Sequence, residues 1–144
     1  MPLCGKGLYF AMGNRLAQYR GNETEWMPMP GTIQRLVATP PETLPRMAIS
    51  LAEGAGLIWG DRNWRNVVFF AHEMHNVHLA FTRSGFLAAV DEERIQVYAI
   101  QKKSIELAAS LKNEIGKPAA VIQGAVAGQF RLITENQIVT FELG

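Results

Sequence analysis

Residues 85–100 read Gly-Phe-Leu-Ala-Ala-Val-Asp-Glu-Glu-Arg-Ile-Gln-Val-Tyr-Ala-Ile, which is two apolar runs separated by a charged segment. Short runs rich in valine, isoleucine, phenylalanine and tyrosine are typical of strands. The stretch therefore predicts a strand, a charged turn and a second strand. We expect Glu92 and Glu93 to be exposed in that turn, because a charged pair between two apolar strands is tolerated only in water.

The same pattern recurs 43 positions further along the chain. Residues 128–143 read Gly-Gln-Phe-Arg-Leu-Ile-Thr-Glu-Asn-Gln-Ile-Val-Thr-Phe-Glu-Leu. The displacement pairs Gly85 with Gly128, Ile95 with Ile138, Tyr98 with Phe141 and Ile100 with Leu143. This spacing is that of one four-stranded propeller blade. The repeat predicts buried side chains at Ile95, Val97, Ile138 and Phe141, and exposed turn residues at Glu135 and Asn136.

Two weaker copies of the pattern precede it. In residues 8–19, Leu16 and Tyr19 lie 79 positions before Ile95 and Tyr98, and Gly13-Asn14 supplies a tight turn. A shorter copy runs over residues 46–70. It aligns residues 47–50, Met-Ala-Ile-Ser, with residues 79–82, Leu-Ala-Phe-Thr.

The rest of the chain also favours strands over helices. Glycine and proline recur every few residues, which breaks any long helix. About ten strand candidates lie between these breakers, at residues 8–12, 46–51, 56–59, 66–70, 78–82, 86–90, 95–100, 119–122, 130–134 and 138–143. Residues 102–114 are ambiguous, since alanine and lysine favour helix, but apolar residues alternate with period two, which favours a strand.

Residues 81–90 read Phe-Thr-Arg-Ser-Gly-Phe-Leu-Ala-Ala-Val and are followed by Val97 and Tyr98, and a similar pattern recurs at residues 128–143. Together these stretches resemble bacterial β-propeller repeats that are loosely related to tryptophan-aspartate (WD) repeats. In those repeats a strand, a turn such as Thr-x-x-Gly, two more strands and an aromatic residue complete each blade. The resemblance implies an all-β fold of antiparallel, four-stranded, blade-like repeats. About three and a half units would fill a single domain over residues 1–144.

A closed propeller needs at least four blades of about 40 residues, which is more than this chain supplies. Either the blades are short, or the sheets do not close within one chain, or several chains complete the assembly together. An open array of repeats leaves edge strands that invite pairing with another copy. We therefore expect a homo-oligomer.

Charge and cysteine content exclude several classes of protein. Lysine and arginine number 14 against 13 acidic residues, with no run of like charge, so a nucleic-acid or acidic-membrane partner is not expected. The single cysteine, Cys4, rules out an intramolecular disulfide. The sequence shows neither a signal-peptide pattern at its start nor an apolar run of about 20 residues, so we expect a cytoplasmic protein.

All three histidines, His72, His75 and His78, fall within seven residues. On a strand, His72 and His78 share a face and His75 points the opposite way. A loop between blades could still bring the three imidazoles onto a divalent transition metal such as zinc, copper or nickel. Solvated histidines in a turn are the alternative, and the sequence favours it. The spacing of three does not meet the zinc-protease signature.

Trp26 and Trp64 are the candidates for partner binding, since tryptophan is frequent at the centre of interfaces. Trp26 lies between Glu25 and a proline-rich turn and is expected to be exposed, whereas most other aromatic residues are expected in the core. No nucleophile elbow or acid–base constellation is recognisable, so an enzyme is the less favoured interpretation. The sequence predicts a non-catalytic interaction or scaffold module that binds a protein partner or its own copy. The alternative is a small metal-binding protein or metal-dependent enzyme that uses His72, His75 and His78.

Overall fold

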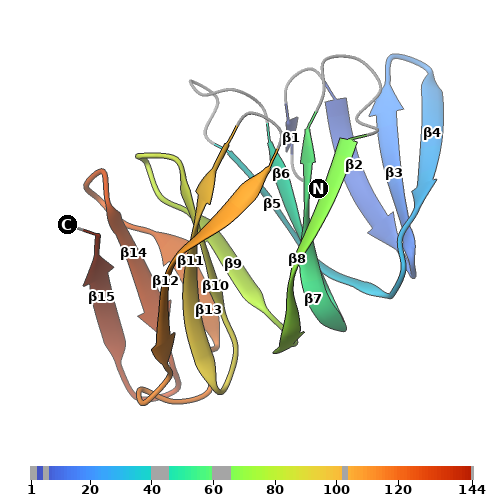
Figure 1. The fold of residues 1–144 in the computed structure, drawn as a ribbon. Helices are drawn as coiled ribbons and strands as arrows, with labels where there is room; N and C mark the ends of the chain where they lie inside the picture. Colours follow the sequence, from blue (N-terminus) through green and yellow to red (C-terminus); the bar gives the residue numbers. More distant parts are fainter. Residues whose placement is uncertain (1–2, 5–6, 40–45, 60–65, 102–103, 144) are drawn as a thin grey trace. The chain divides into compact units, whose positions relative to one another are not determined.

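The computed structural model describes residues 3–4, 7–39, 46–59, 66–101 and 104–143. These residues form fifteen strands, β1 to β15, and no helix (Figure 1). Every pair of neighbouring strands is antiparallel, and the strands form four sheets in chain order. The all-β, antiparallel prediction is confirmed. The described residues contain no helix long and apolar enough to cross a membrane.

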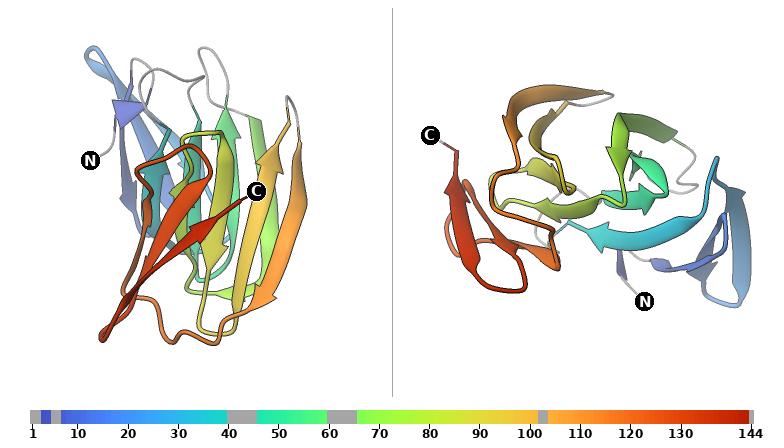
Figure 2. Two further views of the ribbon diagram at one scale, coloured as in Figure 1. Left: turned by 90° about the vertical axis from the view of Figure 1, so that its left-hand side faces the viewer. Right: turned by 90° about the horizontal axis from the view of Figure 1, so that it is seen from below.

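The chain divides into two compact units, Met1–Asn76 and Val77–Gly144, each with two sheets (Figure 2). We call the sheets A and B in the first unit and C and D in the second. Sheets A, B and C have four strands each, and sheet D has three. That residues 1–144 act as a single domain stays a prediction.

Sheet A holds β1 (Leu3–Cys4), β2 (Gly7–Met12), β3 (Arg15–Arg20) and β4 (Glu23–Pro28). Sheet B holds β5 (Ile33–Ala38), β6 (Met47–Leu51), β7 (Glu53–Trp59) and β8 (Asn66–His75). Two-residue turns that begin at Gly13 and Gly21 join β2 to β3 and β3 to β4. Both glycines have positive φ, 61° and 66°. Glycine at the first turn position is what a type II′ hairpin requires, so the turn predicted at Gly13-Asn14 is confirmed.

Sheet C holds β9 (His78–Phe81), β10 (Phe86–Val90), β11 (Arg94–Ile100) and β12 (Ile105–Lys112). Sheet D holds β13 (Ala120–Gln123), β14 (Gln129–Ile133) and β15 (Ile138–Glu142). The strand preferred over a helix within residues 102–114 is therefore present as β12. Strands β1, β4 and β5 have no counterpart among the predicted strands. Strand β8 continues to His75, beyond the predicted residues 66–70, so His72 and His75 lie in a strand and not in the expected turn.

The 43-residue repeat is a repeat of register. Within β10–β11 the pairs are Phe86↔Ala99, Leu87↔Tyr98, Ala88↔Val97, Ala89↔Gln96 and Val90↔Ile95. Within β14–β15 they are Gln129↔Glu142, Phe130↔Phe141, Arg131↔Thr140, Leu132↔Val139 and Ile133↔Ile138, each displaced by 43. The β2–β3 hairpin repeats four of these pairs at a displacement of 79, from Leu8↔Tyr19 to Ala11↔Leu16.

The turns of the two 43-displaced hairpins repeat as well. Asp91 Oδ1 accepts hydrogen bonds from the backbone N–H groups of Glu93 at 2.8 Å and Arg94 at 2.7 Å. Thr134 Oγ1 accepts from the corresponding Asn136 and Gln137 at 3.4 and 3.3 Å. A side-chain oxygen that binds the backbone of its own turn fixes the turn geometry. Glu92, Glu93, Glu135 and Asn136 are exposed, as predicted.

Each sheet has two faces, and the strand register shows which faces of the four sheets are equivalent. We call the face of sheet C that carries Ile95 and Val97 its front, and the face that carries Leu87 and Ala89 its back. The same names apply to the other sheets at the equivalent pairs. Front residues include Leu16 and Gln18 in A, Ala55 and Leu57 in B, and Ile138 and Thr140 in D. Back residues include Leu8 and Phe10 in A, Met47 and Ile49 in B, and Phe130 and Leu132 in D.

The core of each unit lies between the front of one sheet and the back of the next. In the first unit, Tyr9 and Leu16 from the front of A pack with Met47, Ile49 and Ile58 from the back of B. In the second unit the front of C packs with the back of D. The cluster there contains Ala88, Val90, Ile95, Val97, Phe130 and Leu132, with Phe141 partly buried at its edge.

Two details of the predicted repeat are wrong. Ile138 is 66% exposed rather than buried, because it lies on the front of sheet D, whereas sheet D uses its back for the core. Residues 47–50 form the second strand of sheet B, while His78–Phe81 is the first strand of sheet C. Met47 therefore corresponds to Leu87, since the Ser50↔Ala55 and Val90↔Ile95 pairs enclose turns of equal length.

Candidate functional site

An exposed aromatic cluster covers the back of sheet A. Phe10, Ala17 and Trp26 are directly opposite one another on β2, β3 and β4. The Phe10 and Trp26 rings meet edge to face, with centroids 5.8 Å apart and an interplanar angle of 85°. The Arg15 guanidinium lies 4.8 Å from the centroid of the Trp26 ring, within reach of a cation–π interaction.

Three large side chains on this face are open to solvent. Met12 is 56% exposed, Tyr19 43% and Trp26 44%. We call the group formed by Phe10, Met12, Arg15, Tyr19 and Trp26 the aromatic face. Trp26 is exposed as expected from the sequence. Trp64, the second candidate for partner binding, lies outside the described residues.

The other residues of the aromatic face escaped the sequence analysis. The two glycine turns, however, fix the register of β2, β3 and β4. With Gly13 and Gly21 placed at the turns, Phe10, Ala17 and Trp26 fall into one row, and Met12, Arg15 and Tyr19 share their face. The hairpin register was thus the signal that could have found them.

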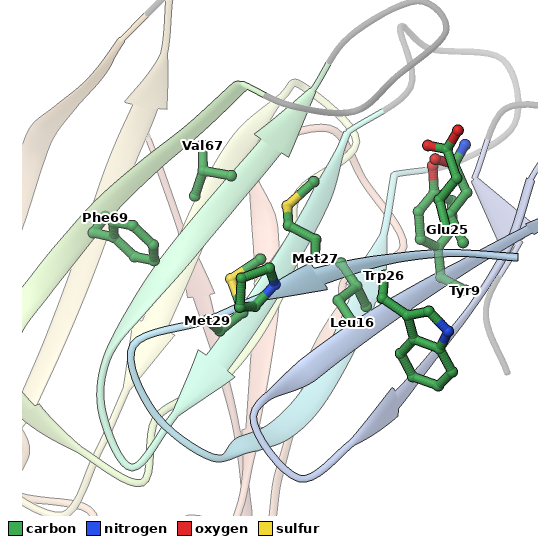
Figure 3. Close-up of a pocket in the computed structure, with 10 residues that line it drawn as sticks. Tyr9, Leu16, Glu25, Trp26, Met27, Met29, Val67 and Phe69 are labelled. Atoms are coloured by element: carbon green, nitrogen blue, oxygen red, sulfur yellow. The ribbon is translucent and has the colours of Figure 1, made fainter.

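A cavity of about 730 Å³ lies against the opposite, front face of the same sheet (Figure 3). Sheet B contributes Val67 and Phe69 to its lining, and Leu16, Met27 and Met29 make much of the rest apolar. In Figure 3 the ring of Trp26 points away from Tyr9 and Glu25. Tyr9, Gln18 and Glu25 form a cross-strand row at this place.

Gln18 is the unusual member of that row. Gln18 is 7% exposed, and its Nε2 atom has no hydrogen-bond partner among the described residues. A buried amide N–H without a partner is costly and uncommon in folded proteins. The cavity therefore combines an apolar lining with one buried donor.

The three histidines are divided between the two units. His72 and His75 are exposed residues of β8, where four residues, from Ala71 to Met74, bulge out of the pairing with β7. Gly54 lies opposite this bulge at φ +76°, and a Cβ atom there would lie 3.1 Å from the carbonyl oxygen of Phe70. His78 begins β9 in the second unit and is 8% exposed.

The Arg35 side chain of β5 forms a hydrogen bond with Asn76, the residue that follows β8. Asn76 has a φ of 54°, and Arg35 Nη1 donates to its Oδ1 atom at 3.0 Å. Partial burial lowers the pKa of the Arg35 guanidinium, which still stays charged at neutral pH. Within the described ranges, no three His, Cys, Asp or Glu side chains gather in a way that could hold a metal ion. Metal binding by His72, His75 and His78 stays a prediction.

The aromatic face and the front cavity are thus the two features of sheet A that could serve binding. The aromatic face offers exposed rings and a cation on a regular sheet, and the cavity offers an apolar lining with one unpaired donor. Comparison with known proteins adds no assignment to either feature, since no protein-family model matches the sequence and no curated protein matches it significantly.

Proposed function

We propose that the chain is a non-catalytic protein-interaction module, built on propeller-blade-like sheets, that binds a protein through the aromatic face. The observation that carries the proposal is the exposure of Tyr19 and Trp26 side by side with Arg15 on one sheet face. Tryptophan, tyrosine and arginine are the residues that most often dominate binding energy at protein interfaces.

The sheet beneath the aromatic face favours tight binding. β2, β3 and β4 are paired along their whole length, and Phe10 packs against the ring of Trp26. Side chains that are already ordered lose little conformational entropy when a partner docks. A partner docked on this face would exclude water from Arg15, which would strengthen a charged contact.

The blade-like part of the proposal rests on register and packing. Three hairpins repeat the same residue pairs, and both units pack the front of one sheet on the back of the next. Propeller blades are antiparallel sheets of four strands that stack in this serial manner. Sheets A, B and C have that strand number.

Photocrosslinking in cells that produce the protein tests the proposal. A photoreactive phenylalanine analogue in place of Tyr19 should form a discrete adduct with a protein partner. The matched control carries the analogue in place of Leu107, which is 49% exposed on β12 of sheet C. Trp26→Ala should abolish the adduct formed at position 19. Equal adducts from both positions, or an adduct unaffected by Trp26→Ala, would refute the aromatic face as the binding surface.

The metal-binding alternative has a separate test. Protein purified without a histidine tag is analysed for zinc, copper and nickel. A stoichiometric metal that disappears in the His75→Ala variant would favour a metal site at His72, His75 and His78. Protein that contains less than stoichiometric metal after dialysis against these ions would count against it.

A further inference from the structure

The cavity against the front of sheet A lies entirely within the first unit. Its volume of about 730 Å³ falls within the range of about 300–1,000 Å³ that is usual for small-molecule sites. Part of its wall comes from β4 and part from β8, which are each the last strand in the order of their sheet. Glu25 of β4 and Phe69 of β8 are exposed, so the cavity opens to solvent between them and a ligand can enter.

The strand register divides the sheet A wall of the cavity into a polar row and an apolar row. Tyr9, Gln18 and Glu25 are directly opposite one another. Leu16 and Met27 form the neighbouring row, two residues away on each strand and therefore on the same face. The two rows are about 7 Å apart along the strands. A molecule that lies along the strands therefore meets polar groups at one end and apolar groups at the other.

Gln18 provides a donor that a ligand can satisfy. Its side chain is buried, and its Nε2 atom has no partner among the described residues, so this amide costs free energy in the ligand-free protein. The strand pairing does not require a polar residue here, because the equivalent residue of sheet C is Val97, which packs in an apolar cluster. An acceptor atom of a bound molecule would remove the cost.

The polar row restricts the head group of such a molecule. The N–H group of Gln18 requires an acceptor and disfavours a cation, because the amide presents the positive end of its dipole. The Glu25 carboxylate in the same row requires a donor and repels an anion. A neutral carboxamide carries both groups side by side, a carbonyl oxygen for Gln18 and an N–H group for Glu25.

The apolar lining favours an aromatic body. Met27 and Met29 contribute thioether groups to the cavity, and Phe69 contributes a ring (Figure 3). Methionine side chains adapt their shape to a ligand, and their sulfur atoms make favourable contacts with aromatic rings.

We propose that this cavity binds a small neutral molecule with an aromatic body and a carboxamide head. The carbonyl oxygen of the head accepts a hydrogen bond from Gln18 Nε2, and its N–H group donates one to the Glu25 carboxylate. The aromatic body contacts Met27 and Met29. The site is on the face of sheet A opposite the aromatic face, so the inference does not depend on the proposed protein interaction.

Three probes with a common naphthalene body test the head group. Naphthalene-2-carboxamide is the expected ligand, and naphthalene-2-carboxylate and 2-naphthylmethylammonium are the matched anionic and cationic controls. In two-dimensional NMR spectra the carboxamide should shift the side-chain amide resonances of Gln18. It should also give nuclear Overhauser effects to the methyl groups of Met27 and Met29. Its dissociation constant should be at least about tenfold lower than that of either control.

Three variants test the residues of the polar row. Gln18→Leu removes the donor and should raise the dissociation constant of the carboxamide about tenfold. Gln34→Leu, the same change on an exposed residue of β5, is the matched control and should leave it unchanged. Glu25→Gln removes the repulsion of an anion, so the carboxylate should bind this variant more tightly than the unchanged protein. The NMR spectrum of each variant verifies its fold.

Four results would overturn the proposal. They are no binding of the carboxamide at millimolar concentration, equal affinity for the three head groups, contacts of the bound carboxamide outside the cavity, and an unchanged affinity in Gln18→Leu. Equal affinities would mean that the cavity is only an apolar surface, and an unaffected Gln18→Leu variant would mean that an ordered water satisfies the amide. The head-group comparison uses the unchanged protein, so it decides the matter even if Gln18→Leu does not fold.

Discussion

Two rows of side chains occupy the same register position in sheets A and C, and they are chemically opposite. In sheet C the row is Ala88, Val97 and Ala109, and in sheet A it is Tyr9, Gln18 and Glu25. The central residues are equally buried, since Val97 is 4% and Gln18 7% exposed. The register of a hairpin therefore does not depend on an apolar residue at this position.

The difference shows which features set the fold and which are free to vary. Turn chemistry and alternation fix the pairing in both hairpins, because a slip by one residue would turn every side chain to the other face. Val97 then packs in the core of the second unit, whereas Gln18 lines the cavity of the first. Sheet A thus tolerates a polar group where sheet C has close-packed apolar atoms, and the consequence should appear as a difference in stability.

The largest expected effect is that of Val97→Gln. The change places an amide among apolar side chains of the cluster that contains Ile95 and Phe130, where it finds neither water nor a partner. We expect the free energy of unfolding to fall by about 3 kcal/mol, measured by urea denaturation. The control, Leu107→Gln on an exposed position, should change it by less than about 0.5 kcal/mol. If Val97→Gln is also neutral, sheet C accepts the polar row as readily as sheet A.

The two repeated turns provide the next prediction. Asp91 is 6% exposed, and its carboxylate accepts two short hydrogen bonds from the backbone of its turn. The Asp91→Ala substitution removes this acceptor. The stability should fall by about 2 kcal/mol, and Asp91→Asn, which keeps the oxygen, should recover most of it. Thr134→Ala removes longer bonds in a less buried turn and should cost about 0.5 kcal/mol. Equal losses at the two turns would contradict the comparison.

Much of the fold could be predicted from the sequence because the repeat preserves the pattern of alternation and the turn residues. The displacement of 43 gave the pairing of β10 with β11 and of β14 with β15, and Gly13 marked a hairpin. β4 was missed because it is an exposed edge strand that contains two glutamates and a proline, so it shows no apolar alternation. β5 was missed because prolines surround it on both sides.

Alternation shows which residues share a face, but not which face is covered. That limit explains the wrong prediction at Ile138, which repeats Ile95 in sequence and differs from it only in what lies above the sheet. For the same reason the burial of Gln18 could not be predicted from the sequence, since a polar residue in an alternating strand is normally on the solvent side. The candidate site was accessible from the sequence only through Trp26, because the row that contains Phe10 and Ala17 depends on three strands at once.

The remaining prediction is an increase in stability, smaller than the losses expected for Val97→Gln and Asp91→Ala. Gln18→Leu removes the amide whose Nε2 atom lacks a partner and keeps a side chain of similar size against Leu16 and Met27. We expect the free energy of unfolding to rise by about 1 kcal/mol, with an unchanged dependence on urea concentration. Ser50→Ala is a second test of the same idea, because Ser50 is 0% exposed and its Oγ atom also has no partner among the described residues. A loss of stability in Gln18→Leu would instead mean that an ordered water or a bound molecule satisfies the amide in solution.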